Sequence, residues 1–407
     1  MKDYAQLKRK LKDTVLQHID YARELTDEEV ENQIDEVLLQ EAQLSTWMVD
    51  QRRRLRKELF DSLRRLDILQ IFVEDPSITE IMINGKDHIF IEQDGRLQEL
   101  DMCFESVDKL KDVIQQIVAG CNRVVNETSP IVDARLENGA RVNIVMSPVA
   151  LNGPIVTIRR FPDKPVTMDE LLLREAISRD AAQFLKALVK AGYNIFISGG
   201  TGSGKTTFLN VLSGYIPKDE RVITIEDSAE LQLQDIRNLV RLETRNGNGE
   251  GCQEITIRDL IRTSLRMRPD RIIVGEVRGA EAIDLLQCLN TGHDGSMSTG
   301  HANSAADMLA RLENMVLMGM DIPLKAIRQQ IASGLDIIVH LGRLRDKTRK
   351  ILEIIEIVSY ENDEILLNPL FHFEELGEKE DGTVDGILRE KGVLIHVEKL
   401  SRAGLAI

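Results

Sequence analysis

Apolar residues recur every three or four positions through residues 1–66, a stretch with many charges but no glycine and no proline. This spacing gathers apolar side chains on one face of a helix and therefore predicts helical structure. Ile34, Val37, Leu38 and Leu44 would form one such stripe. We expect a small N-terminal helical bundle that serves as a docking segment, although its sequence indicates no partner.

The pattern changes near residue 67, where short apolar runs alternate with turn residues such as Asn84-Gly85. Short runs bounded by turns are typical of strands, and residues 107–119 have helical spacing instead. The expected strands are residues 78–85, 88–92, 131–136, 141–146 and 155–160. Residues 67–161 are therefore predicted to form an α+β middle domain.

Residues 162–176 are expected to be a linker, because Pro162 and Pro165 frame polar residues and Thr167 resembles a helix cap. Beyond the linker, buried apolar strands alternate with helical stretches, which predicts an α/β domain over residues 177–360. Residues 361–407 contain several glycines and are expected to form a small C-terminal appendage of loops and strands.

The strongest motif is G-x-x-x-x-G-K-[ST] at residues 199–206, between an apolar strand and a helix start. Glycines let backbone N–H groups converge on phosphates, and the helix N-terminus points its positive end at the same place. In this motif Lys205 neutralises β- and γ-phosphate charge and the Thr206 hydroxyl ligates Mg²⁺. The expected nucleotide-binding residues are Gly200, Thr201, Gly202, Ser203, Gly204, Lys205, Thr206 and Thr207.

Two later strands end in acidic residues, where open α/β sheets bind their ligands. Glu226 is a candidate to orient or deprotonate a water, whereas its neighbour Asp227 is also well placed to cap a helix. Glu276 ends a strand of Walker B form and is expected to hold Mg²⁺ through water or to polarise the attacking water. Arg278 follows it and is expected to read the nucleotide state.

Two histidines lie in a stretch rich in glycine, serine and threonine at residues 291–304. A metal site is not expected there, because no third ligand accompanies them. We expect His301 to sense the γ-phosphate; the alternative is a structural histidine that holds a loop.

Arginines gather in three places. At the end of the middle domain, Arg135, Arg141, Arg159 and Arg160 either stabilise charge on the γ-phosphoryl group or lie on strand edges. Arginines of residues 258–268 would line one helix face, either solvated or at a subunit interface. A basic cluster at residues 52–57 is expected to be a solvated helix face paired with acids such as Glu58, rather than a partner-binding site.

The overall charge argues against a nucleic-acid motor. The 407 residues include 52 basic and 67 acidic side chains, for a net charge of −15, so a global positive field is missing. Four scattered cysteines indicate neither a disulfide framework nor a zinc site. No apolar run approaches the ~20 residues that span a bilayer, and no signal peptide is recognisable. We expect a cytoplasmic protein that reaches the membrane only through partners.

With these motifs in hand, the chain resembles the type II/type IV secretion ATPase superfamily, and within it the CpaF-type Tad/Flp pilus assembly ATPases. The resemblance covers about residues 65 to 360. It rests on residues 199–207, an "Asp box" at 224–230, residues 275–279, a "His box" at 298–304, and the stretches 133–143 and 157–161. The zinc-binding tetracysteine insert of related extension ATPases is absent, and the N-terminal helices fit the CpaF type better than the shorter conjugative relatives.

This resemblance implies a RecA-like core preceded by a PAS-like middle domain, and a homo-hexameric ring that hydrolyses ATP with Mg²⁺. It implies nucleotide bound between the middle domain and the core, and work done on an inner-membrane platform protein that inserts or extracts pilin subunits. Lys205, Glu226, Glu276 and His301 become catalytic residues, Thr206 and Glu276 the metal-holding ones, and Arg135, Arg141, Arg159, Arg160 and Arg278 nucleotide-facing candidates. A conjugative type IV secretion ATPase, or a nucleic-acid motor, is the alternative.

Overall fold

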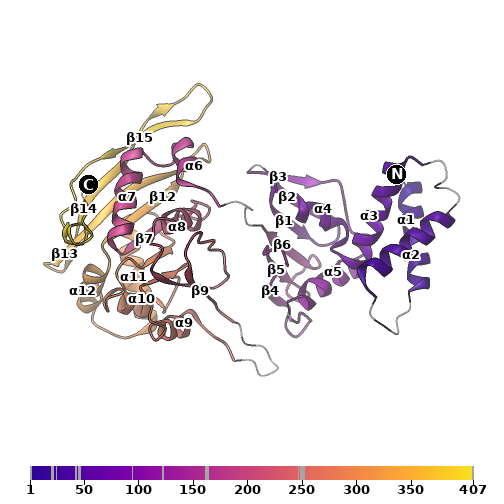
Figure 1. Cartoon of the computed structure of the whole chain (residues 1–407), viewed down its shortest axis with the longest axis horizontal. Helices are drawn as coiled ribbons and strands as arrows, with labels where there is room; N and C mark the ends of the chain where they lie inside the picture. Colours follow the sequence, from indigo (N-terminus) through magenta and orange to yellow (C-terminus); the bar gives the residue numbers. More distant parts are fainter. Residues whose placement is uncertain are drawn as a thin grey trace. The chain divides into compact units, whose positions relative to one another are not determined.

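The computed structural model describes the chain except for residues 1, 20–22, 24, 42, 43, 45, 46, 94, 122, 161–164, 246, 248–252, 406 and 407. The chain divides into two compact units, Met1–Asp163 and Lys164–Ile407, each with its own core (Figure 1). Most of the glycine-rich stretch at residues 246–251, which the sequence predicts to be a flexible polar loop, lies outside the described residues. Along the part that is described, no helix is both long and apolar enough to cross a membrane.

Three helices open the first unit: α1 (Lys2–His18), α2 (Asp27–Gln40) and α3 (Val49–Arg64). Their apolar faces meet in one cluster that includes Leu11, Ile34 and Leu55. The predicted stripe is confirmed for Ile34, Val37 and Leu38, which α2 turns toward this cluster, whereas Leu44 lies beyond the end of α2 and is buried in the cluster from there. Acidic partners hold the basic cluster of α3, with Arg54 on Glu58, Arg56 on Asp35 and Glu31, and Lys57 on Glu74.

The rest of the first unit is an antiparallel sheet with one main helix. A 3₁₀ turn (Asp67–Leu69) and α4 (Gln70–Glu74) lead into it. Its six strands lie in the order β3-β2-β1-β6-β5-β4. Alternate residues such as Ile81, Ile83 and Val142 face a core that α5 (Val107–Ala119) covers. The strands are β1 (Ile78–Asn84), β2 (His88–Gln93), β3 (Arg96–Leu100), β4 (Ile131–Arg135), β5 (Arg141–Val145) and β6 (Ile155–Arg159).

A nine-stranded sheet forms the second unit, in the order β15-β14-β13-β12-β7-β11-β10-β8-β9. The six strands from β12 to β9 pair in parallel, and β13, β14 and β15 extend the sheet antiparallel. The parallel strands are β7 (Ile195–Gly199), β8 (Arg221–Glu226), β9 (Asn238–Glu243), β10 (Arg271–Val274), β11 (Met297–Gly300) and β12 (Ile337–Arg343). The others are β13 (Arg349–Glu361), β14 (Glu364–Glu378) and β15 (Val384–Glu390).

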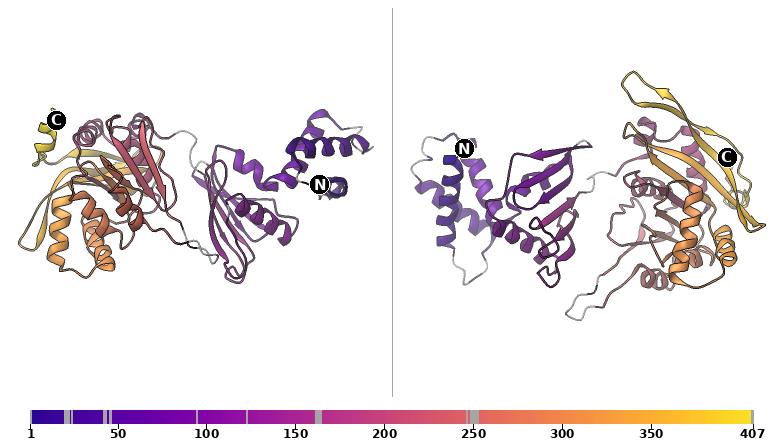
Figure 2. Two further views of the ribbon diagram at one scale, coloured as in Figure 1. Left: turned by 60° about the horizontal axis from the view of Figure 1, so that its bottom comes forward. Right: turned by 180° about the vertical axis from the view of Figure 1, so that it is seen from behind.

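Helices cover both faces of this sheet (Figure 2). Ile195 and Ile197 of β7 face a core shared with α7 (Arg179–Ala191) and α8 (Lys205–Ser213), while Phe196 faces the opposite core. That second core is closed by α9 (Ile257–Ser264), α10 (Ala282–Leu289), α11 (Ala305–Gly319) and α12 (Leu324–Gly334). Strands buried on both faces are the reason that the sequence shows continuous apolar runs here.

Two expected boundaries differ from the structure. Part of the expected linker forms α6 (Met168–Leu173), which begins at a Thr167–Glu170 capping box and packs against the core. Residues 361–407 are not a separate appendage, because β14 and β15 continue the main sheet and α13 (Glu398–Arg402) packs against α7. The strand β9 is a further element that the sequence pattern did not indicate.

Two arginines of α9 form ion pairs with the same carboxylate, that of Asp284. Arg258 Nε lies 2.6 Å from Asp284 Oδ2 and Arg262 Nε lies 2.8 Å from Asp284 Oδ1. Asp284 belongs to α10 and is almost fully buried. These two ion pairs join α9 to α10, and the Arg262 side chain is still 57% exposed.

Candidate nucleotide-binding site

The phosphate-binding loop joins β7 to α8 at the carboxyl edge of the parallel strands. Gly204 caps α8 with φ 93° and Gly202 has φ 70°, backbone conformations that glycine adopts without strain. A side chain at Gly199 would collide with the carbonyl oxygen of Leu341 and the hydroxyl of Ser203. The loop can therefore turn sharply and leave its N–H groups and the start of α8 facing one place.

Lys205 lies at the centre of the site and is buried. Its Nζ donates hydrogen bonds to the carbonyl oxygens of Gly199 and Gly200, at 3.1 and 2.9 Å, and to His301 Nδ1 at 3.3 Å. Burial lowers the pKa of Lys205 below its ordinary value. The ammonium group is thus held over the loop, where the motif predicted it.

His301 connects Lys205 to Glu276. Its Nε2 lies 2.8 Å from Glu276 Oε1, although the two atoms lack the alignment of a hydrogen bond. Burial and then the Lys205 charge lower the pKa of His301 below its ordinary value. A neutral ring that accepts at Nδ1 carries its proton on Nε2, so His301 presents an N–H toward the carboxylate.

Glu276 is also bound by Arg278. Glu276 Oε2 accepts a hydrogen bond of 2.7 Å from Arg278 Nη2, and Arg278 Nη1 lies 3.9 Å from Asp227 Oδ2. The Glu276 carboxylate raises the pKa of the Arg278 guanidinium further. Lys205, His301, Glu276 and Arg278, predicted from separate motifs, therefore form one chain of contacts.

Glu226 ends β8, which pairs directly with β10 through Ile225 opposite Val274. Its Oε1 accepts hydrogen bonds from the N–H groups of Glu230 and Leu231, at 2.7 and 2.8 Å. Its Oε2 is buried and has no hydrogen-bond partner among the described residues. Burial raises the pKa of Glu226 to about 7. A carboxylate with one free oxygen and this pKa suits a general base at neutral pH.

The alternative role for Asp227 is wrong in this structure. The residues after it form bends and loop rather than a helix, so Asp227 has no helix to cap. Its carboxylate instead accepts a hydrogen bond of 2.9 Å from the Thr244 hydroxyl. Glu230 lies in the same loop, and its N–H group donates a hydrogen bond to the Glu226 carboxylate.

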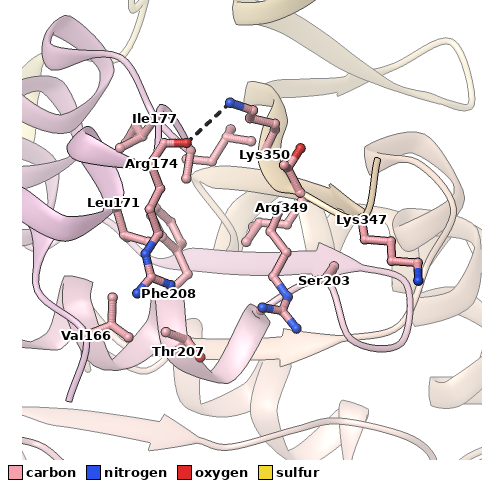
Figure 3. Close-up of a pocket in the computed structure, with 15 residues that line it drawn as sticks. Val166, Leu171, Arg174, Ile177, Ser203, Thr207, Phe208, Lys347, Arg349 and Lys350 are labelled. Atoms are coloured by element: carbon pink, nitrogen blue, oxygen red, sulfur yellow. Dashed lines mark hydrogen bonds between the residues drawn. The ribbon is translucent and has the colours of Figure 1, made fainter. Parts of the chain in front are cut away.

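A pocket of about 300 Å³ opens beside the loop and was not indicated by any sequence motif (Figure 3). Its walls come from α6, the start of α8 and the segment that leads into β13, and they include Leu171, Phe208 and Ile351. Arg174 and Arg349 extend toward the start of α8 (Figure 3), and Arg349 Nε donates to the Gly202 carbonyl at 2.8 Å. No sequence motif indicates this pocket, because its walls combine the expected linker with the start of β13, which is far away in the chain.

The four candidate arginines of the middle domain belong to the first unit. Arg135 pairs with Arg141 across β4 and β5, and Arg141 pairs with Arg159 across β5 and β6, so three guanidinium groups form one row. Like charges directly opposite each other on a sheet destabilise it. Acids of the same sheet offset part of this charge, because Arg141 Nη2 lies 3.9 Å from Asp133 Oδ1 and Arg159 Nε lies 3.8 Å from Glu80 Oε1. Arg160 is different, because it donates to the backbone carbonyl of Asp75.

Comparison with known proteins assigns the family. The family model described as "Type II/IV secretion system protein" matches residues 63–377, which include all of the motifs above. The chain belongs to the type II/IV secretion system protein family. The resemblance noted in the sequence is thereby confirmed at the level of this family.

Relatives of this family member include conjugation and secretion proteins. The conjugal transfer protein TrbB of Rhizobium radiobacter is 32% identical over 313 residues, covering 76% of this chain and 92% of TrbB. The type IV secretion system protein VirB11 of Bartonella quintana is 30% identical over 332 residues, covering 72% of this chain and 92% of VirB11.

Solved structures show the same fold. The ATPase DotB of Legionella pneumophila superposes with a TM-score of 0.53 at 21% identity, covering 72% of this chain and 80% of DotB. The pilus retraction motor PilT with bound ADP superposes with a TM-score of 0.51 at 19% identity, covering 75% of this chain and 82% of PilT. The predicted fold class, a P-loop α/β core preceded by an N-terminal domain, is confirmed.

Proposed function

We propose that this ATPase converts ATP hydrolysis into mechanical work on a membrane secretion machine, and that the machine is a Tad/Flp type IV pilus. The observation that carries the proposal is the chain of contacts from Lys205 through His301 to Glu276 and Arg278, with Glu226 on the neighbouring strand. These are a phosphate-neutralising cation, a neutral N–H donor and two carboxylates around one loop.

The loop binds the triphosphate through the backbone N–H groups of residues 200–207, and Lys205 turns from the loop carbonyls to the β- and γ-phosphates. Glu226 Oε2 accepts a proton from the attacking water. His301 donates from Nε2 to the γ-phosphate and so reports whether it is present. Each role uses a group that the structure leaves available: an unshared carboxylate oxygen, an imidazole N–H and a helix N-terminus.

Oxygen donors suited to Mg²⁺ are present in the same place. Thr206 lies in the first turn of α8, and Glu276 Oε1 is a buried oxygen without a hydrogen bond from the described residues. Hydroxyl and carboxylate oxygens are the ligands this hard cation prefers. A Mg²⁺ ion held there would neutralise negative charge on the phosphate groups. Thr206 and Glu276 would hold it, Glu276 directly or through water.

The pocket beside the loop would take the nucleoside. It adjoins Thr207, the last residue of the loop, and its apolar walls provide a surface for a base to pack on. Arg349 and Arg174 would contact the ribose and α-phosphate. The arginine row of Arg135, Arg141 and Arg159 would stabilise charge on the γ-phosphate, either within the subunit or from a neighbouring one.

The proposed assembly is a homo-hexamer at the cytoplasmic face of the inner membrane, bound to a membrane platform protein. The N-terminal helices and the motif pattern support the pilus type. The names of TrbB and VirB11 support a second candidate, a conjugative type IV secretion ATPase. A nucleic-acid motor is least supported, because the net charge is −15.

The test is genetic complementation with a matched inactive variant. A strain lacking this gene should lose surface pili and regain them with the wild-type gene, but not with Glu276→Gln at equal protein level. The native mass of Glu276→Gln protein with Mg-ATP should correspond to about six subunits if the protein assembles into the proposed closed hexameric ring. Loss of plasmid transfer with normal pili would contradict the pilus proposal and favour the conjugative one.

A further inference from the structure

A buried lysine, Lys350, joins α6, the first helix of the second unit, to the main sheet. It lies at the start of β13 and is only 5% exposed. Its Nζ donates hydrogen bonds to the backbone carbonyl oxygens of Glu175, at 2.8 Å, and of Arg174, at 3.4 Å (Figure 3). A carboxylate oxygen of Glu175 lies 3.8 Å from the same Nζ. Both carbonyl groups follow the last residue of α6, so the ammonium group fastens the end of this helix to β13.

The end of α6 has a backbone conformation that its sequence does not favour. Glu175 has φ 52°, in the left-handed region where a helix end usually has glycine. The Glu175 N–H donates to the Leu172 carbonyl at 3.0 Å, and the Ala176 N–H donates to the Leu171 carbonyl at 2.8 Å. These two bonds form a common helix-ending turn, but the side chain of Glu175 makes this turn less favourable than glycine would. Lys350 supports the turn from outside, through two of its carbonyl groups.

The same turn forms one wall of the pocket that would take the nucleoside. Its residues that line the pocket are Leu171, Arg174, Ala176 and Ile177. Arg349, the neighbour of Lys350 in β13, reaches the phosphate-binding loop instead, where its Nε donates to the Gly202 carbonyl at 2.8 Å. Two consecutive residues of β13 therefore hold the loop proposed for the phosphates and the wall proposed for the nucleoside.

Packing alone does not account for a lysine at this position. Ile177 and Ile351 beside it belong to the apolar core. An ammonium group that leaves water costs free energy unless its hydrogen bonds are made, and a methionine would fill similar space without this cost. The Ile351 N–H also donates to the Ala176 carbonyl at 2.9 Å, so the backbone link between α6 and β13 does not depend on the lysine side chain. The contribution of Lys350 is specific to the carbonyl groups of the turn.

We infer that Lys350 is a positioning residue that holds the last turn of α6 in the conformation that forms the nucleoside pocket. The inference rests on the proposed placement of the nucleoside in this pocket. Lys350 is not a catalytic residue, because it acts through the backbone of α6 and not on the reacting atoms.

The test compares two ligands of the full-length protein, one with a nucleoside and one without. Lys350→Met should raise the Kd for ADP about tenfold, because the pocket wall would adopt its binding conformation for a smaller fraction of the time. The Kd for inorganic pyrophosphate, which has only phosphates for the loop to bind, should change by less than about twofold. Isothermal titration calorimetry with Mg²⁺ measures both constants. Lys325→Met, on the exposed start of α12, is the matched control and should change neither.

A second substitution tests the turn itself. Glycine adopts the backbone conformation of residue 175 without strain, so the turn should then need less support from Lys350. Adding Glu175→Gly to Lys350→Met should therefore bring the Kd for ADP back to within about threefold of the wild-type value. General damage to the core would not be repaired in this way.

Three results would overturn the inference: an equal rise of both Kd values in Lys350→Met, a folded Lys350→Met protein with the wild-type Kd for ADP, or no recovery with Glu175→Gly. If Lys350→Met does not fold, Lys350→Gln, which keeps an amide donor, enters the same comparison with a smaller expected rise for ADP alone.

Leu171→Ala separates this inference from the proposed placement of the nucleoside, because it shortens a side chain of the pocket wall and keeps Lys350. If Leu171→Ala raises the Kd for ADP relative to pyrophosphate and Lys350→Met does not, the inference about Lys350 fails alone. If neither variant changes that ratio, the placement of the nucleoside fails with it.

Discussion

His301 Nε2 lies 2.8 Å from Glu276 Oε1. The two residues follow β11 and β10, which are neighbours in the sheet, so the contact joins two parallel strand ends. Lys205 occupies the other ring nitrogen at 3.3 Å. A ring with a lowered pKa between an ammonium and a carboxylate is a neutral donor whose N–H can turn from Glu276 to a phosphate oxygen.

Replacing His301 should therefore affect turnover more than binding. We expect His301→Ala to lower kcat about 100-fold, the cost of losing one donor to developing charge, with the Kd for ADP within about twofold. Steady-state hydrolysis and fluorescence titration measure the two quantities. A rise in KM at normal kcat would instead indicate a residue that only binds the ground state.

Glu226 should set the pH dependence of hydrolysis. Its buried carboxyl has a pKa of about 7 and must be deprotonated to accept a proton from water. We expect kcat at saturating Mg-ATP to rise with pH through about 7 and then level off, with the slope of a single ionisation. A kcat that is flat between pH 6 and 8 would exclude Glu226 as the base.

The same burial should make Glu226 destabilising at neutral pH. Below its ordinary pKa of 4.5 the carboxyl is protonated in both the folded and the unfolded chain. As the pH rises toward about 7, the unfolded chain loses the proton while the folded chain keeps it, so folding stability falls. Above about pH 7 the carboxyl is ionised in both states, and the loss of folding stability reaches its full value.

Glu226→Gln should remove this cost. We expect it to raise the free energy of unfolding at pH 8 by up to about 3 kcal/mol and to change it little at pH 4.5. Urea unfolding followed by circular dichroism at the two pH values gives the difference. A stabilisation that is equal at both would show that the carboxyl is not the cause.

The C-terminal helix should contribute to the stability of the core through Lys399. Its Nζ lies 2.7 Å from Asp336 Oδ2, 2.9 Å from Asp294 Oδ1 and 3.2 Å from the Gly192 carbonyl oxygen. Lys399→Met should lower the free energy of unfolding by about 1 kcal/mol, a modest value because the group is partly exposed. Lys325→Met, on the exposed start of α12, should leave the urea midpoint unchanged and serves as the control.

The residues of the proposed site could be brought together from the sequence because each one follows a buried strand. The parallel strands β7, β8, β10 and β11 bring their carboxyl ends to one edge, so Lys205, Glu226, Glu276 and His301 converge although about 100 residues separate the first from the last. The motifs are recognisable in the sequence because the proposed phosphate chemistry needs particular residue types at the carboxyl ends of these strands.

Other features depend on tertiary contacts that no local pattern records. Asp227 looked like a helix cap, but the following segment instead donates its N–H groups to Glu226. The pocket beside the loop combines α6 with β13, about 180 residues later in the chain. His340 is a polar residue within the apolar run of β12, and the run alone does not show which residues its side chain contacts.

The most direct test of this account is ATP hydrolysis by wild-type protein and Glu276→Gln, measured as phosphate release at saturating Mg-ATP. We expect the wild type to turn over and Glu276→Gln to retain less than about one hundredth of kcat while binding ADP with the Kd of the wild type. Hydrolysis by Glu276→Gln at the wild-type rate would contradict the proposed site.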